Sequence, residues 1–313
     1  MAGPRDRSWP PDPEPLPHAL VDNHTHLDTS APGAGGFELG RGGAERSWAP
    51  TVAEHVERAA GVGVTRMIQI GCDLPAARWT DDVVRCHDSL LGGVAVHPNE
   101  VTLHAGVREV APDGLETAPQ PHHEVDLDQA IAEIAQIAAL NDRIRVIGET
   151  GLDHFRAGER GRAVQRDSFR KHIALAKELG LALQIHDRDA HQDVLDVLEA
   201  DGAPERTVFH CFSGDAAMAR HCAERGWYLS FAGTVTFTAS SGLREALHAV
   251  PLSQVLLETD APFLTPHPYR GRPNAPYLVA MTARAVAAEL DVDLEHLCRT
   301  VWETSEQVYG PWS

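Results

Sequence analysis

Six side chains in this sequence have the types and the placement of ligands for divalent metal ions. His24 and His26 stand two residues apart, directly after the apolar run 19–22. In an extended segment such residues point to the same side, so the pair can hold one ion. The other four candidates also follow apolar runs; they are Glu149, His186, His210 and Asp260. Each alone has an ordinary explanation as a hydrogen-bonded residue, but their recurring position predicts one common metal site.

The chemistry of this donor set narrows the choice of metal. Imidazoles and carboxylates without a thiolate suit Zn²⁺, Mn²⁺ or Mg²⁺. Six ligands exceed what a single catalytic zinc needs, since such a site takes three and leaves one position open. A bridging carboxylate would let them hold two ions, as in many phosphatases and nucleases. One ion surrounded by further hydrogen-bonded histidines is the alternative.

The elements that must position these residues are short apolar runs separated by helical patterns. Seven or eight such runs recur, at 19–22, 65–70, 93–96, 145–147, 181–185, 207–209, 227–231 and 254–257. They show little alternation, as expected of strands buried on both faces. Between them the stretch 167–179 places Phe169, Ile173, Ala176 and Leu179 on one face, with Gly180 as a C-cap. The pattern predicts a (β/α)₈ TIM barrel, and an open doubly wound sheet is the alternative.

The barrel accounts for residues 19–313 as a single domain. The proline-rich segment 1–18 is predicted to be a disordered tail. Residues 29–50 and 107–125 interrupt the strand–helix rhythm and are expected to be two long loops on the top face of the barrel. Such loops either shape the substrate cleft or are plain surface insertions.

Composition excludes several classes of protein. The net charge of −18 argues against a protein that coats nucleic acid, although metal ions can still supply positive charge within a site. No apolar stretch reaches the roughly 18 residues of a membrane helix, and the N-terminus lacks a secretory signal, so a cytoplasmic protein is expected. The five cysteines include no Cys-x-x-Cys pair, which disfavours a zinc ribbon or a disulfide framework.

Seven motifs together resemble the successive signatures of the TatD family. They are HTHLD at 24–28, AVHP at 95–98, GETGLD at 148–153, IHDRDA at 185–190, HCFSG at 210–214, ETDAP at 258–262 and RGRPNAP at 270–276. They run in order from about residue 19 to the C-terminus. The resemblance implies a divalent-metal deoxyribonuclease on an amidohydrolase-like barrel.

The resemblance also implies a role for each matched residue. One ion would be held by His24, His26, Glu149 and Asp260, and the second by Glu149, His186 and His210. His97 matches a position beside the substrate phosphate, whereas His154 stands where relatives more often have Tyr. Arg270 and Arg272 are candidates either to clamp a phosphate or to tie the last loop to the barrel.

The sequence therefore predicts a hydrolase, most simply an exonuclease on single-stranded DNA. A metal-activated water would attack phosphorus, with Asp260, Glu149 and His97 as catalytic residues and Asp260 as the candidate general base. The alternative substrates are esters or amides, such as an aminoacyl-tRNA linkage, and a metal-binding scaffold without activity is a further alternative. DNA is the expected partner; no membrane and no stable protein partner are expected, and the protein would be a monomer or weak oligomer.

Overall fold

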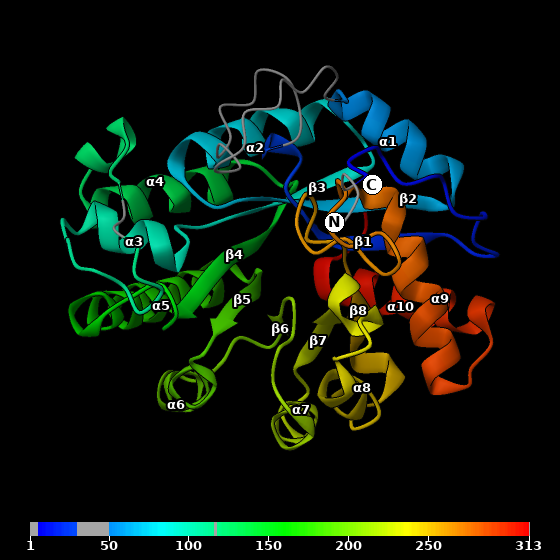
Figure 1. Ribbon diagram of the computed structural model, residues 1–313. Helices are drawn as coiled ribbons and strands as arrows, with labels where there is room; N and C mark the ends of the chain where they lie inside the picture. The colour runs from blue at the N-terminus through cyan, green and yellow to red at the C-terminus, as the bar shows by residue number, and fades with distance from the viewer. Residues whose placement is uncertain (1–5, 30–49, 116–117, 313) are drawn as a thin grey trace, which may run out of the picture.

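Eight parallel strands, hydrogen-bonded in chain order, form the centre of the molecule (Figure 1). The computed structural model describes residues 6–29, 50–115 and 118–312. Within them the strands are β1 Leu20–Thr25, β2 Val64–Gly71, β3 Leu90–Val94, β4 Ile144–Asp153, β5 Ala182–Arg188, β6 Thr207–Phe209, β7 Tyr228–Phe231 and β8 Val255–Leu257. Each predicted run overlaps a strand, although β3 begins and ends earlier than its predicted run at 93–96. β4 and β5 continue beyond their apolar runs into the motifs that follow.

The first and last strands meet, so the sheet is a nearly closed barrel. The side-chain amide of Asn23 in β1 donates to the carbonyl of Leu257 at 2.9 Å, and the backbone N–H of His26 donates to Ala261 at 2.8 Å. This consecutive order with β1 beside β8 excludes the doubly wound sheet and confirms the (β/α)₈ fold.

Helices cover the outside of the barrel (Figure 1). They are α1 Val52–Gly61, α2 Leu74–Cys86, α3 Pro98–His104, α4 Leu127–Leu140, α5 Glu159–Leu179, α6 His191–Asp201, α7 Ala216–Glu224, α8 Ser241–Leu247, α9 Val279–Leu290 and α10 Leu294–Tyr309. Short 3₁₀ turns are η1 Leu27–Thr29, η2 Pro121–Glu124, η3 Gly233–Thr236, η4 Leu252–Gln254 and η5 Pro276–Leu278. Among the described helices, none is long and apolar enough to cross a membrane.

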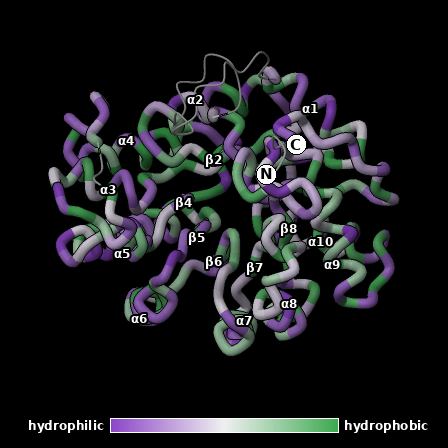
Figure 2. The backbone as a smooth tube through the Cα atoms, viewed as in Figure 1, coloured by the Kyte–Doolittle hydropathy of each residue, from purple (hydrophilic) through white to green (hydrophobic). Residues whose placement is uncertain are grey.

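The helix predicted over 167–179 is the C-terminal part of α5. Phe169, Ile173 and Ala176 are buried, and Gly180 ends the helix in the left-handed conformation with φ 61°. Hydrophobic and hydrophilic residues alternate along the outer helices (Figure 2), as expected of helices that bury one face. The helix begins earlier than predicted, at Glu159, because its first turns are polar and carry little apolar periodicity.

Two hydrophobic layers hold the strands in place. The larger lies between the strands and the outer helices. The smaller joins inward-facing residues of neighbouring strands, such as Val21, Val146 and Val208, and includes Tyr309 and Trp312 at the C-terminus. Because every strand buries both faces, the carboxyl ends of the strands are held rigidly, and any site built there inherits that rigidity.

The N-terminal segment 6–18 differs from the predicted disordered tail. It contains no helix or strand, but its backbone carbonyls accept hydrogen bonds from the barrel. Tyr277 donates to Pro10 at 2.7 Å, and Arg284 donates to Glu14 at 2.8 Å. Leu16 also pairs its N–H with Val62 at 3.0 Å and is buried. Proline removes N–H donors but not carbonyl acceptors, so a proline-rich segment can still dock in this way.

The structure describes most of one predicted long loop and almost none of the other. Nearly all of the loop 29–50 lies outside the described residues. The loop 107–125 follows α3 after the carboxyl end of β3, and its described parts, 107–115 and 118–125, include η2. Its first residue, Val107, donates its N–H to Thr102 at 2.9 Å, and the carbonyl of Val125 at its end contacts the His104 ring. The described ends of this loop are therefore docked against α3.

Candidate metal centre

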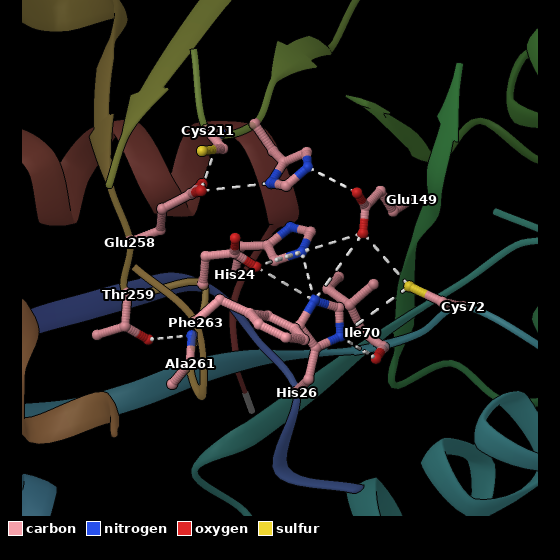
Figure 3. A network of polar contacts seen from close by, with 12 residues as sticks. His24, His26, Ile70, Cys72, Glu149, Cys211, Glu258, Thr259, Ala261 and Phe263 are labelled. Atoms are coloured by element: carbon pink, nitrogen blue, oxygen red, sulfur yellow. Dashed lines mark hydrogen bonds and ion pairs between the residues drawn. The ribbon is translucent and has the colours of Figure 1, made fainter. Parts of the chain in front are cut away.

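The six predicted metal ligands converge at the carboxyl ends of the strands. His24 lies in β1, with His26 just after it; Glu149 and His186 lie in β4 and β5; and His210 and Asp260 follow β6 and β8. His24, His26, Glu149 and His210 are buried, and Asp260 and His186 are mostly so. Figure 3 shows Glu149 facing His24 and His26 across the mouth of the barrel. We call these six residues the strand-end centre.

One oxygen of Glu149 belongs to a first group of donors. Its Oε2 atom lies 3.5 Å from His24 Nε2 and 3.9 Å from His26 Nε2. Asp260 Oδ1 lies 3.3 Å from His26 Nε2 and 3.9 Å from His24 Nε2. Four donors from three parts of the chain thus face a common point, at separations expected of ligands around one ion.

The other oxygen of Glu149 belongs to a second group. Its Oε1 atom lies 2.6 Å from His186 Nδ1 and 2.8 Å from His210 Nε2. The two oxygens of one carboxylate therefore face two different sets of imidazoles. This arrangement is that of a bridging ligand, because each oxygen can coordinate a separate ion.

In each of the four imidazoles, one ring nitrogen has a hydrogen-bond partner outside the two groups, and the other nitrogen can bind a metal. His24 Nδ1 lies 2.8 Å from Gln184 Oε1, and His26 Nδ1 lies 3.1 Å from the carbonyl of Ile70. In the other group, His186 Nε2 lies 3.2 Å from Asp153 and His210 Nδ1 lies 3.3 Å from Glu258. Metal-binding histidines in proteins almost always have such partners, which fix the ring and its tautomer.

The geometry of His24 and His26 shows whether a metal ion fits between their rings. The amide of Gln184 donates to Asn23 and Tyr309, so its Oε1 atom accepts from His24 Nδ1. Both Nε2 atoms are then unprotonated in the neutral rings, and they lie only 3.2 Å apart. Two lone pairs at this distance repel unless a proton or a metal ion lies between them, so the donor set fits a bound metal ion.

The buried carboxylates and imidazoles of the site shift one another's pKa values. Burial disfavours the charged form of Glu149, but the imidazoles of His210 and His97 outweigh it and hold the Glu149 pKa well below its ordinary value. Burial likewise opposes protonation of His26 and His186, yet the neighbouring carboxylates raise the pKa of each to about 9. Carboxylates that draw protons onto buried imidazoles will equally attract a divalent cation.

His97 lies beside the second group. Its Nε2 atom is 3.3 Å from Glu149 Oε1 and 3.4 Å from His186 Nδ1. Its Nδ1 atom accepts the backbone N–H of Asn99 at 3.1 Å, so the proton of the neutral ring is on Nε2. The ring is therefore arranged to donate a hydrogen bond rather than to bind a metal.

The predicted substrate-contact residues are placed less uniformly. His154 packs at the end of β4, with Nε2 3.6 Å from Asp193. Arg272 donates to the carbonyls of Ser8 and Trp9 and to the Ser8 hydroxyl, so it ties the N-terminal segment to the last loop. Arg270 is exposed and lies over the Phe237 ring, 4.9 Å from its centroid. Of the two arginines, Arg270 is the one that makes no side-chain hydrogen bond with the described residues.

Three further residues support imidazoles of the centre and carried no predicted role. Asp153 and Glu258 accept from His186 and His210, and Gln184 accepts from His24. Gln184 stands two residues before His186 in the same strand, so its inward orientation is readable from the strand period. Asp153 and Glu258 lie within the matched motifs, but only the fold shows which imidazole each one contacts.

The fold and this site together define a metal-dependent hydrolase of the barrel type. The family model "TatD related DNase" matches residues 21–310. A protein of Mycobacterium tuberculosis named "Uncharacterized metal-dependent hydrolase TatD" is 40% identical over 295 residues, covering 93% of this chain and 98% of that protein. YabD of Bacillus subtilis, also named a metal-dependent hydrolase, is 29% identical over 292 residues, with coverages of 93% and 98%.

Solved structures agree with the fold. The TatD homolog YjjV of Escherichia coli superposes with a TM-score of 0.74 at 21% identity, covering 93% of this chain and 98% of that one. A TatD-family hydrolase of Entamoeba histolytica gives a TM-score of 0.75 at 16% identity, with coverages of 95% and 99%. This chain belongs to the TatD family and is a metal-dependent hydrolase.

Proposed function

We propose that the protein is a deoxyribonuclease that hydrolyses phosphodiester bonds of single-stranded DNA with two divalent ions. The observation that supports this most directly is the division of Glu149, whose two oxygens face two separate imidazole groups. Two ions bridged by a carboxylate are typical of enzymes that cleave phosphate esters. The family's printed description, a related DNase, supports the same class of substrate. The cytoplasmic location and the monomeric or weakly associated state stay predictions.

The bound ions, when present, would acidify a water molecule and neutralise charge on the phosphate. Asp260 is the residue we assign to accept the proton from that water. Its side chain is 13% exposed, against 6% for Glu149 and 0% for His24, so Asp260 is the carboxylate of the set that faces solvent. Its low pKa, held down by His26 against the effect of burial, keeps it ionised at neutral pH.

The phosphate would enter on the open side of the centre. His97 and His186, 14% and 18% exposed, lie with Asp260 on that side. His97 would donate its Nε2 proton to a phosphate oxygen, since its tautomer is fixed by Asn99. Arg270 would bind a neighbouring phosphate through its exposed guanidinium. His154, which follows β4 and lies 3.6 Å from Asp193, is a further candidate contact for the substrate.

The decisive assay uses metal-stripped protein and end-labelled single-stranded DNA. Mg²⁺, Mn²⁺ or Zn²⁺ is added back, and products are resolved on a denaturing gel. We expect a metal-dependent ladder with the wild type and at least about 10²-fold slower cleavage with Asp260→Asn. The end that carries the label will show the direction of digestion. Arg270→Ala should raise KM for the oligonucleotide with little change in kcat.

The matched control for Arg270→Ala is Arg272→Ala, because Arg272 is taken up by the N-terminal segment. That variant should lose stability rather than affinity for DNA. An aminoacyl ester is assayed in parallel with the DNA. Turnover of the ester without cleavage of DNA would overturn the nuclease assignment, while leaving the metal-dependent hydrolase intact.

A further inference from the structure

A second cluster of histidines and carboxylates lies outside the strand-end centre. It consists of Asp73, Glu100, His104, His122 and His123, which we call the α3 cluster. Two sets of three offer ligand atoms within 4.8 Å of one another: His104 with His122 and His123, and Asp73 with Glu100 and His122. His122 belongs to both sets. None of these residues takes part in the hydrolytic site described above.

Local structure explains why these residues meet. Glu100 and His104 are four residues apart in α3, so they lie on the same face of the helix. His122 and His123 come from η2 in the loop 107–125, which docks against α3. Asp73 is the N-cap of α2, where its Oδ1 atom accepts the N–H of Ala76. A helix, a cap and a loop thus each contribute donors to the cluster.

The His104 ring shows an unused nitrogen inside this cluster. Its Nδ1 atom lies 2.7 Å from the carbonyl of Val125, so that nitrogen carries the proton. Its Nε2 atom is buried and has no hydrogen-bond partner among the described residues, and the residue as a whole is only 5% exposed. A buried acceptor without a donor costs free energy. The same arrangement, Nδ1–H on a carbonyl with Nε2 free, is what metal-binding histidines have.

The other two rings have distinct roles around Glu100. His123 Nδ1 accepts the N–H of Gln120 at 2.7 Å, so its Nε2 carries the proton and donates to Glu100 Oε2 at 2.6 Å. That ring holds the carboxylate in place. His122 Nε2 lies 3.1 Å from the same oxygen, a separation close to that of two neighbouring ligands on one ion. Its Nδ1 atom has no hydrogen bond among the described residues, whereas its Nε2 atom donates to Glu100, so that proton would leave the ring when Nε2 binds an ion.

We propose that the α3 cluster is a second metal site, which binds one divalent ion of the zinc class through His104, His122 and Glu100. Asp73 is within reach as the fourth donor, and His123 positions Glu100. Two imidazoles with one or two carboxylates form a donor set that suits Zn²⁺. The ion would fasten η2 to α3, whose N-cap residue is His97. This inference goes beyond the proposed nuclease function and does not depend on the substrate.

The test measures zinc in a protein whose strand-end centre has been disabled. Glu149→Ala and Asp260→Ala are combined, the protein is equilibrated with Zn²⁺ and freed of excess, and zinc per chain is measured by mass spectrometry. We expect one tightly held ion, which is lost when His104→Gln and His122→Gln are added. The matched control adds His248→Gln and His296→Gln, two exposed histidines elsewhere, and should keep the ion. Equal zinc content and affinity in both variants would overturn the proposal.

A variant of His123 distinguishes a metal ligand from a residue that only positions a ligand. His123→Gln should weaken zinc affinity by about 10–100-fold without abolishing it, as expected for a group that orients a ligand. Complete loss of the ion, as with His104→Gln, would make His123 a ligand and contradict the assignment.

A measurement on the unmodified chain covers the case in which a variant does not fold. Wild-type crystals equilibrated with Zn²⁺ are measured on both sides of the zinc absorption edge. An anomalous peak between His104, His122 and Glu100 is expected. Occupied strand-end sites with no peak at the α3 cluster would sink the proposal.

Discussion

The strand-end centre and the α3 cluster have similar donors but are built in opposite ways. The first takes its ligands from strands spread from β1 to β8, and its rings are supported by groups from other parts of the barrel, such as Gln184 in β5 and Glu258 after β8. The second takes most of its donors from one helix and the loop that follows it. We infer that the barrel core holds the ligands of the strand-end centre in place. At the α3 cluster, in contrast, the bound ion would hold in place the loop that supplies its ligands.

The largest effect should come from removing the residue that joins the two halves of the strand-end centre. Glu149→Ala deletes both oxygens that face the imidazole groups. We expect bound metal to fall at that centre and hydrolysis to drop by at least about 10³-fold. Metal per chain and the rate on labelled DNA are measured on the same preparation. Zinc at the α3 cluster should stay, which would separate the two regions directly.

Glu303→Ala, at an exposed position of α10, is the control for this change. It should alter neither metal content nor rate. If Glu149→Ala kept its full metal complement, the bridging role of that carboxylate would be wrong, whatever the effect on activity.

The fold, and the meeting of the six candidate ligands at one end of it, could be predicted from the sequence for the same physical reason. Strands buried on both faces leave short apolar runs, and a parallel barrel brings the carboxyl end of every run to one face. His24, Glu149 and His210 therefore could be grouped although they are far apart in the chain. The lengths of the strands were harder to predict from the sequence, because β4 extends through polar residues as far as Asp153.

The remaining contacts could not be predicted from the hydrophobic periodicity of the sequence. Nothing in the order of residues shows that Arg272 binds the N-terminal segment, or that this segment docks through its carbonyls. The spacing of Glu100 and His104 does indicate a shared helix face, but their meeting with His122 requires the path of the loop. Loop geometry is set by tertiary contacts rather than by local pattern.

A buried histidine outside both clusters differs from the histidines within them. His172 in α5 is fully buried, and both of its ring nitrogens are satisfied by the chain: Nδ1 by the carbonyl of Ser168 and Nε2 by the N–H of Val96. Burial lowers its pKa to about 4, against about 6.5 in the unfolded chain. Unlike the histidines of the two clusters, it has no nitrogen left for a metal.

This pKa shift predicts a loss of stability in acid. Well above pH 6.5 neither state binds the proton, so His172 contributes no pH dependence there. As the pH falls below 6.5, the unfolded chain is protonated while the folded state resists until about pH 4. The free energy of unfolding should therefore drop by about 2 kcal/mol between pH 7 and pH 5 from this residue alone.

Urea unfolding of metal-free protein at a series of pH values provides the measurement. His172→Gln, though less stable overall, should have a shallower dependence between pH 6.5 and 5. Parallel curves for the variant and the wild type would show that His172 is protonated in the folded state, contrary to its buried contacts.

A smaller effect is expected from the group that supports His210. Glu258 is fully buried, with Oε1 3.3 Å from His210 Nδ1 and 2.8 Å from the N–H of Cys211. Glu258→Gln keeps the shape and an acceptor oxygen but removes the charge. Affinity of the strand-end centre for Zn²⁺ should weaken by about tenfold, measured by competition with a chelator. Unchanged affinity would mean that the ring orientation, rather than the charge, is what Glu258 supplies.

The smallest effect tests whether the two regions communicate. His97 is the N-cap of α3 and contacts Glu149, while Glu100 and His104 lie further along the same short helix. Emptying the α3 cluster with His104→Gln and His122→Gln should loosen the loop but leave the position of His97 set mainly by β3 and Asn99. We therefore expect hydrolysis to fall by no more than about threefold, although added Zn²⁺ raises the melting temperature by less than it does when the cluster is intact. A fall as deep as that of Glu149→Ala, with metal at the strand-end centre retained, would show that the α3 cluster governs the active site rather than only fastening a loop beside it.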